Sequence, residues 1–180
     1  MKLVSTFVGV ILLTFMTFTA QALTLPSPTN YQLIATGGDI NLTFLSKEAA
    51  YSSDLFLVGS PNVILNNQTA VIGQQFNLGS FQAGIDIVFS LFVNDTGHQF
   101  FTGPASSNPD NVVHALFNEI NGDTIQIQIS FEDLLNGGDL DYNDLIFSVT
   151  NVAVVPEPQS YLMMLLGLLL LVQLKRRNQH

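Results

Sequence analysis

The sequence predicts an all-β protein, an antiparallel β-sandwich of jelly-roll type, flanked by an N-terminal signal helix and a short C-terminal transmembrane helix. Three observations predict the sandwich. Apolar residues alternate with polar ones in DTIQIQISF, residues 123–131, as in a strand with one buried face. Turn sequences rich in Gly, Asn and Pro separate this segment from others like it. No stretch between the two ends repeats its apolar residues at helical spacing.

The first 22 residues have the features of a secretory signal peptide. Lys2 supplies a basic start, residues 3–18 are almost entirely apolar, and Ala20-Gln21-Ala22 offers the small residues that a signal peptidase needs. We expect export, with cleavage after Ala22. A retained N-terminal membrane anchor is the alternative.

The folded domain is expected over residues 23–153. Its candidate strands are 31–36, 40–45, 54–59, 62–65, 85–93, 98–103, 112–117, 123–131 and 144–152. Two nearly continuous apolar runs, 88–93 and 145–152, indicate central strands. Eight to ten short strands with one apolar face each are typical of a β-sandwich.

The charge of this domain limits its partners. It holds thirteen of the fourteen acidic residues and one of the five basic residues, Lys47, which leaves about twelve net negative charges. Such a surface repels nucleic acid and anionic lipid and favours cations or neutral partners. The chain has no cysteine, so an exported domain of this size depends on its core, on bound ions, or on both.

The most acidic segment is FEDLLNGGDLDYNDLIF, residues 131–147. Carboxylates about 5 Å apart repel by roughly 3 kcal/mol at an effective dielectric near 20, so they must splay into water, stay protonated or bind a cation. Leu134, Leu135 and Leu140 are expected to tuck under the sheet and limit splaying. Gly137 and Gly138 allow a tight reversal before the acidic run.

The spacing in this segment favours calcium over an empty acidic turn. Asp139, Asp141 and Asn143 stand at i, i+2 and i+4, so an extended backbone would point them the same way. An oxygen-only ligand set suits Ca²⁺. The segment is not an EF-hand, because Asp144 stands where that loop needs glycine and Thr150 stands where it needs glutamate.

The same segment resembles the closing signature of a bacterial extracellular β-sandwich domain of unassigned function. The resemblance covers residues 85–149, including the approach sequence NPDNVVH with His114. It implies bound calcium, and it implicates as ligands Glu132, Asp133, Asp139, Asp141, Asn143 and Asp144. Asp110 is a further candidate from the neighbouring loop.

The C-terminal residues 154–180 resemble a PEP-CTERM sorting domain. Pro156-Glu157-Pro158 is followed by an apolar helix expected over 161–174 and by the basic cluster Lys175, Arg176 and Arg177. Fourteen helical residues span roughly 21 Å, which is short for a bilayer core of about 30 Å. The resemblance implies an inner-membrane-anchored precursor and cleavage by an exosortase in a bacterium that makes exopolysaccharide. A bare anchor without processing is the alternative.

We therefore expect a non-enzymatic, calcium-stabilised protein delivered to the cell surface or the biofilm matrix, with an adhesive or structural role. His114 lies in the alternating segment VVHALF, which favours a histidine on a strand face over a catalytic base. No nucleophile-elbow pattern is present in the sequence. A carbohydrate-binding module of the exopolysaccharide matrix is the alternative function, and a secreted polysaccharide hydrolase is a weaker one.

Overall fold

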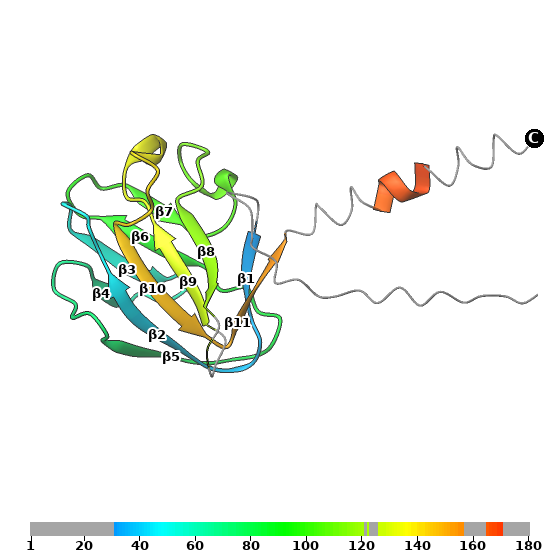
Figure 1. Ribbon diagram of the computed structural model, residues 1–180, viewed down its shortest axis with the longest axis horizontal. Coiled ribbons are helices and arrows are strands. Elements are labelled where there is room, and N and C mark those ends of the chain that lie inside the picture. The colour runs from blue at the N-terminus through cyan, green and yellow to red at the C-terminus, as the bar shows by residue number, and fades with distance from the viewer. Residues whose placement is uncertain (1–30, 121, 123–125, 157–164, 171–180) are drawn as a thin grey trace, which may run out of the picture.

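Two antiparallel sheets pack against each other in the computed structural model, which describes residues 31–120, 122, 126–156 and 165–170 (Figure 1). The larger sheet has the strand order β5 (Gln75–Phe81), β2 (Gly38–Ser46), β10 (Leu145–Thr150), β9 (Gln126–Phe131) and β8 (Ala115–Ile120). The smaller sheet has the order β4 (Val63–Asn66), β3 (Ser53–Leu57), β6 (Phe89–Val93) and β7 (Gln99–Phe101). The sequence prediction of an antiparallel β-sandwich is thus confirmed.

Aromatic side chains join the two sheets. The ring of Phe89 on β6 meets the ring of Phe147 on β10 edge to face, with centroids 5.1 Å apart. Both rings are fully buried. Burying rings of this size supplies much of the hydrophobic stabilisation available to a domain without disulfides.

The period-two pattern places the core correctly along the central strands. Ile127, Ile129 and Phe131 of β9 are buried, as their alternation with polar residues predicts. The expected strand 85–93 is shorter than predicted, because regular pairing of β6 starts at Phe89 and Ile85 is about half exposed. An isolated bridge between Asp86 and Ile34, with backbone hydrogen bonds of Ile85 and Ile87 to β1, continues it.

Two strands were not foreseen as such. β5 is an edge strand whose residues are all at least partly exposed, so it lacks a continuous apolar face. β11 (Val152–Pro156) leaves the larger sheet and pairs antiparallel with β1 (Tyr31–Ala35) as a separate two-stranded ladder. Tyr31 stands opposite Pro156 in this ladder, so the two ends of the described domain meet beside each other (Figure 1).

Several expectations fall outside the described residues. These are the signal peptide with its cleavage after Ala22, Glu157 and Pro158 of the sorting signal, and the basic cluster 175–177. Within the expected C-terminal helix, residues 165–170 are helical. In the described part of the chain, no helix is long and apolar enough to cross a membrane.

Candidate metal centre

The acidic segment forms the connection between β9 and β10 at one end of the sandwich. Glu132 and Asp133 directly follow β9, and Asp144 directly precedes β10. The base of the connection is closed by the pairing of Phe131 with Leu145 and by the Asp144 amide, which donates to the Phe131 carbonyl at 3.2 Å. The carboxylates on either side of this base are therefore held near one another by the sheet itself.

Glu132, Asp133 and Asp144 form the inner group of carboxylates. One oxygen from each lies within 4.8 Å of the others, so the three could hold a metal ion. The Asp133 amide donates to Oδ2 of Asp144 at 2.8 Å, which fixes the two aspartates relative to each other. Ser53, the first residue of β3, donates its hydroxyl to Oδ2 of Asp133 at 3.4 Å. The inner group thus touches both sheets.

Glu132, Asp139 and Asp141 form the outer group. One oxygen from each again lies within 4.8 Å of the others. Glu132 is buried, whereas both aspartates are exposed. Glu132 therefore belongs to both groups and stands between the interior and the solvent.

The Glu132 carboxylate is the least satisfied group of the centre. Only 1% of the residue is exposed, and its Oε2 is buried without a hydrogen-bond partner among the described residues. Burial, followed by the charge of Asp144, raises the pKa of Glu132 to about 8. Burial and the charge of Asp144 also raise the pKa of Asp133 to about 7. A cation at this point would replace the protons that these pKa values imply.

The backbone of the connection is bent in a way that extended residues cannot achieve. Asn136, Leu140 and Tyr142 all have positive φ, at 60°, 62° and 54°. This conformation is uncommon for bulky side chains, and it clusters at functional sites. Asp139 and Asp141 are therefore brought together by a tightly wound loop and not by the extended backbone that the sequence spacing suggested.

Gly138 is required for a separate reason. Its φ is 47°, and a Cβ at this position would collide with Oε1 of Glu132 and lie 3.0 Å from Leu134. The Glu132 carboxylate thus occupies the space that a side chain would fill. Gly137 and Gly138 both have positive φ, as the predicted tight reversal requires. Gly138 also lets the Glu132 carboxylate approach the backbone closely.

His114 and Asp110 support the connection from the side of β8. Nδ1 of His114 is 2.9 Å from the Glu132 carbonyl, and Nε2 is 2.9 Å from Oδ2 of Asp110. The Glu132 carbonyl only accepts hydrogen bonds, so Nδ1 donates to it, while Nε2 contacts the Asp110 carboxylate. The same Asp110 oxygen accepts from the Asn136 amide at 2.7 Å. Burial opposes ionisation of Asp110, but the hydrogen bonds from His114, Asn136 and Val112 outweigh it and lower its pKa.

The predicted ligands differ in where they lie. Glu132, Asp133, Asp139, Asp141 and Asp144 all belong to one or both groups. Asn143 lies beside them and donates through its side chain to Asp141 and to Glu48. Asp110 is outside both groups, and its carboxylate is taken by the contacts described above, so it acts as a support.

One packing prediction for this segment was wrong. Leu134, Leu135 and Leu140 do not tuck under the sheet but are 39%, 38% and 57% exposed. The side chain that anchors the connection is Tyr142, which is 8% exposed and donates its hydroxyl to the Val113 carbonyl at 3.0 Å. A left-handed backbone at Tyr142 turns this ring inward, an orientation that spacing along the sequence does not reveal.

The acidic signature and the strands that carry it are similar to a known sequence family. Residues 81–151 match the Domain of unknown function (DUF4114). The DUF4114 match includes β6 to β10 and every carboxylate of the two groups. It encloses the range over which the sequence resembles an extracellular β-sandwich domain. No curated protein and no solved structure matches the chain.

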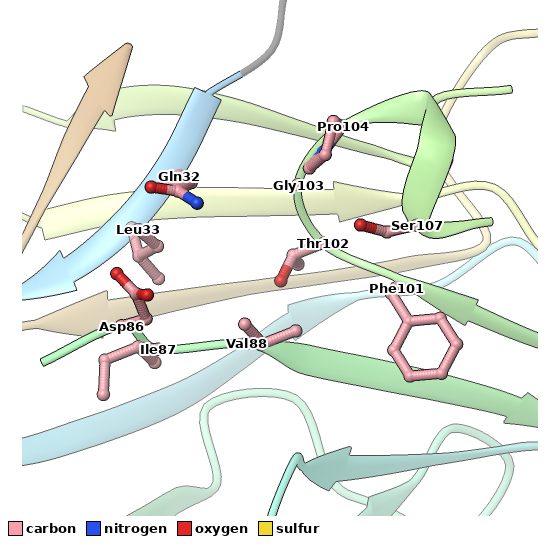
Figure 2. Close-up of a pocket in the computed structure, with 10 residues that line it drawn as sticks. All are labelled: Gln32, Leu33, Asp86, Ile87, Val88, Phe101, Thr102, Gly103, Pro104 and Ser107. Atoms are coloured by element: carbon pink, nitrogen blue, oxygen red, sulfur yellow. The ribbon is translucent and has the colours of Figure 1, made fainter. Parts of the chain in front are cut away.

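A pocket of about 330 Å³ lies away from the carboxylates, between β1 and the segment 101–107 that contains the 3₁₀ turn η1 (Ala105–Ser107) (Figure 2). Gln32 and Ser107 turn their polar ends toward each other across it in this view. Asp86 lies below Gln32 and Leu33 in the same view, and Phe101 lies below Ser107. The Thr102 hydroxyl also lines the pocket but is bonded to the backbone of Phe89.

Without a bound ion, the protein is expected to lose stability as the pH rises. Glu132 and Asp133 bind protons more tightly when folded, so their stabilising contribution is complete below about pH 4 and is lost as the pH rises through about 7 to 8. Calorimetry in chelator should show a midpoint lower by on the order of 10 °C at pH 9 than at pH 5. Glu132→Gln should flatten this dependence, whereas the exposed Glu119→Gln should preserve it. A midpoint that rises with pH in the parent protein would contradict the assignment.

Proposed function

We propose that this chain is a non-enzymatic, exported β-sandwich protein that binds calcium at the acidic connection and acts at the cell surface or in the extracellular matrix. The observation that carries the calcium part is the Glu132 carboxylate. It is buried, its Oε2 has no partner among the described residues, and four further carboxylates lie around it. A buried carboxylate without a partner is costly, and a divalent cation removes that cost.

The ligand chemistry favours calcium over other metals. Both carboxylate groups offer oxygen alone, whereas zinc prefers nitrogen and sulfur. Calcium accepts six to eight oxygens in irregular arrangements, and magnesium demands a near-ideal octahedron. Glu132, Asp133 and Asp144 would hold the ion from the interior side, with Asp139, Asp141 and Asn143 available on the exposed side. When bound, the ion would neutralise these charges. It would also hold together the two ends of the connection, after β9 and before β10.

A catalytic role finds little support at this centre. Both ring nitrogens of His114 are occupied, one by Asp110 and the other by the Glu132 carbonyl. A general base needs a free nitrogen within reach of a substrate proton. The acidic surface makes nucleic acid an unsuitable partner. These points support a structural or adhesive role.

The destination is inferred from the two chain ends. The leader with Ala20-Gln21-Ala22 supports export, and the segment beginning at Pro156 supports PEP-CTERM sorting. On this proposal an exosortase-type enzyme processes an inner-membrane-anchored precursor whose basic cluster 175–177 faces the cytoplasm. The released domain then joins exopolysaccharide or other surface proteins.

Calcium should raise the thermal midpoint of the parent protein, and removing the shared carboxylate should abolish the rise. At several millimolar calcium, a site of extracellular type adds about 1–3 kcal/mol, or roughly 5 °C or more. Glu132→Gln should lose this gain while remaining at least as stable as the parent in chelator, because a buried amide stays neutral without taking up a proton. Asp139→Ala combined with Asp141→Ala should reduce the gain, and Glu119→Gln should retain it. A parent midpoint that is the same with calcium and with chelator would remove the ion from the proposal.

The sorting proposal predicts a specific mature protein. Mass spectrometry of material purified from its own cells should show an N-terminus at Leu23 and a C-terminus near the Pro156-Glu157-Pro158 motif. Replacing Pro156 and Glu157 by alanine should leave the tail attached and the protein in the membrane fraction. If the tail of the unaltered protein stays uncut in cells with an active exosortase, the sorting proposal is wrong. The tail would then be a membrane anchor without processing.

The pocket between β1 and residues 101–107 favours carbohydrate binding as a second candidate function. Its volume is at the lower end of typical ligand cavities and suits a single sugar unit. Gln32, Asp86 and Ser107 can exchange hydrogen bonds with hydroxyl groups, and Phe101 offers an apolar edge. Among the residues that the structure describes, no basic side chain lines the pocket, so a neutral ligand fits better than an anionic one.

Glycan binding at this pocket should depend on its polar wall. On an array of neutral glycans and the native exopolysaccharide, the parent protein should bind, and Asp86→Ala combined with Gln32→Ala should weaken binding at least tenfold. Asp54→Ala serves as the control, because Asp54 is on β3 and does not line the pocket. Equal binding by all three proteins would place the glycan elsewhere, and no binding by the parent would remove this candidate.

A further inference from the structure

We propose that the acidic centre holds two calcium ions, one inside and one outside, bridged by the carboxylate of Glu132. This inference rests on the proposed calcium-binding function and concerns the number and arrangement of the ions. Its basis is that the five carboxylates form two groups and not one.

The spacing of the oxygens separates the two groups. Ligands of a single calcium lie 2.3–2.6 Å from the ion, so their oxygens fall within about 5 Å of one another. Glu132, Asp133 and Asp144 meet this condition, and so do Glu132, Asp139 and Asp141. Among the described residues, the two aspartate pairs do not join into one group that meets it. One ion can therefore take one pair together with Glu132, and the second pair is left for another ion.

The two oxygens of Glu132 have different surroundings. Oε2 is buried and has no partner among the described residues. Oε1 lies against Gly138, the residue directly before Asp139, so close that a Cβ at Gly138 would collide with it. One oxygen is thus enclosed and the other faces the loop that carries the outer aspartates. A carboxylate placed in this way can bridge two cations.

Charge favours two ions over one. Five ionised carboxylates carry five negative charges, so one calcium leaves three in excess and two calcium ions leave one. Carboxylates within about 5 Å repel one another strongly when partly buried. With one ion bound inside, the repulsion between Asp139 and Asp141 would remain. These two residues flank Leu140, whose positive φ brings them together.

The two positions differ in exposure, and this difference predicts their order of binding. Glu132 and Asp133 are 1% and 2% exposed, whereas Asp139 and Asp141 are open to solvent. The inner ion exchanges most of its water for protein oxygens and binds first. The outer ion keeps more of its water, so it binds at least tenfold more weakly and orders the exposed loop when calcium is abundant.

The number of ions can be counted directly. Isothermal titration of the full-length protein with calcium chloride, in a neutral detergent and after removal of bound metal, should give two ions per chain in two steps. Asp139→Asn combined with Asp141→Asn should leave one ion with the tighter affinity. The matched control removes two exposed acids elsewhere, Asp39→Asn combined with Glu119→Gln, and should still bind two. Glu132→Gln should weaken both steps, and circular dichroism of each variant should confirm an unchanged fold.

The possible results separate this inference from the proposed function. One ion in the parent protein would overturn the two-ion arrangement and leave calcium binding intact. Two ions that both persist in the Asp139 and Asp141 double variant would also overturn it, because the outer position would then lie elsewhere. No heat and no bound calcium in a parent of intact fold would overturn both proposals.

Discussion

The carboxylate of Glu132, enclosed where β9 ends, is the constraint on which this end of the molecule depends. Its burial raises its own pKa, and with the charge of Asp144 it makes the ion-free state unfavourable at neutral pH. Its Oε1 occupies the space beside Gly138, so the loop must have glycine there. Its backbone carbonyl accepts a hydrogen bond from Nδ1 of His114. One residue thus links the strand, the loop and the support from β8.

The supports of this carboxylate come from both sheets. Ser53 at the start of β3 reaches Asp133, and Phe100 on β7 stacks on the ring of His114 with centroids 3.8 Å apart. His114 in turn holds Asp110, which receives the amide of Asn136. The buried start of the acidic connection, Glu132 and Asp133, is therefore held from both layers of the sandwich, and these two carboxylates cannot move apart by a simple opening of the loop. This restriction is the basis for proposing a cation there.

Much of the sandwich was predictable because its central strands obey the simple rule of alternation. Phe131 and Phe147 fall on buried faces as their spacing requires. The edge strand β5 was not predicted, because its residues are all partly or fully exposed and no alternation of apolar and polar residues marks a buried face. The separation of β11 from β10 depends on Asn151, whose φ of 57° turns the chain and is not encoded in hydrophobic pattern.

At the candidate centre, the types of residue were more informative than their spacing. The density of carboxylates between two strands pointed to a cation, because repulsion at short range is large whatever the loop conformation. The loop path was not foreseeable, since it rests on left-handed residues such as Leu140 that sequence preference disfavours. The contacts of Asp110 could not be predicted for a related reason. Its partner His114 is four residues away in a non-helical segment, so only the fold shows their contact.

The short ladder of β1 and β11 has a mechanical consequence. The register runs from Tyr31 opposite Pro156 to Ala35 opposite Val152, and the tail continues from Pro156. A force applied through the tail would unzip the ladder one residue pair at a time, starting from Tyr31 and Pro156. It would not shear all five pairs together. Along the chain from Pro156, the ladder is the first pairing to be loaded, ahead of the strands of the two sheets. It would thus act as a weak link that yields first and protects the layers behind it.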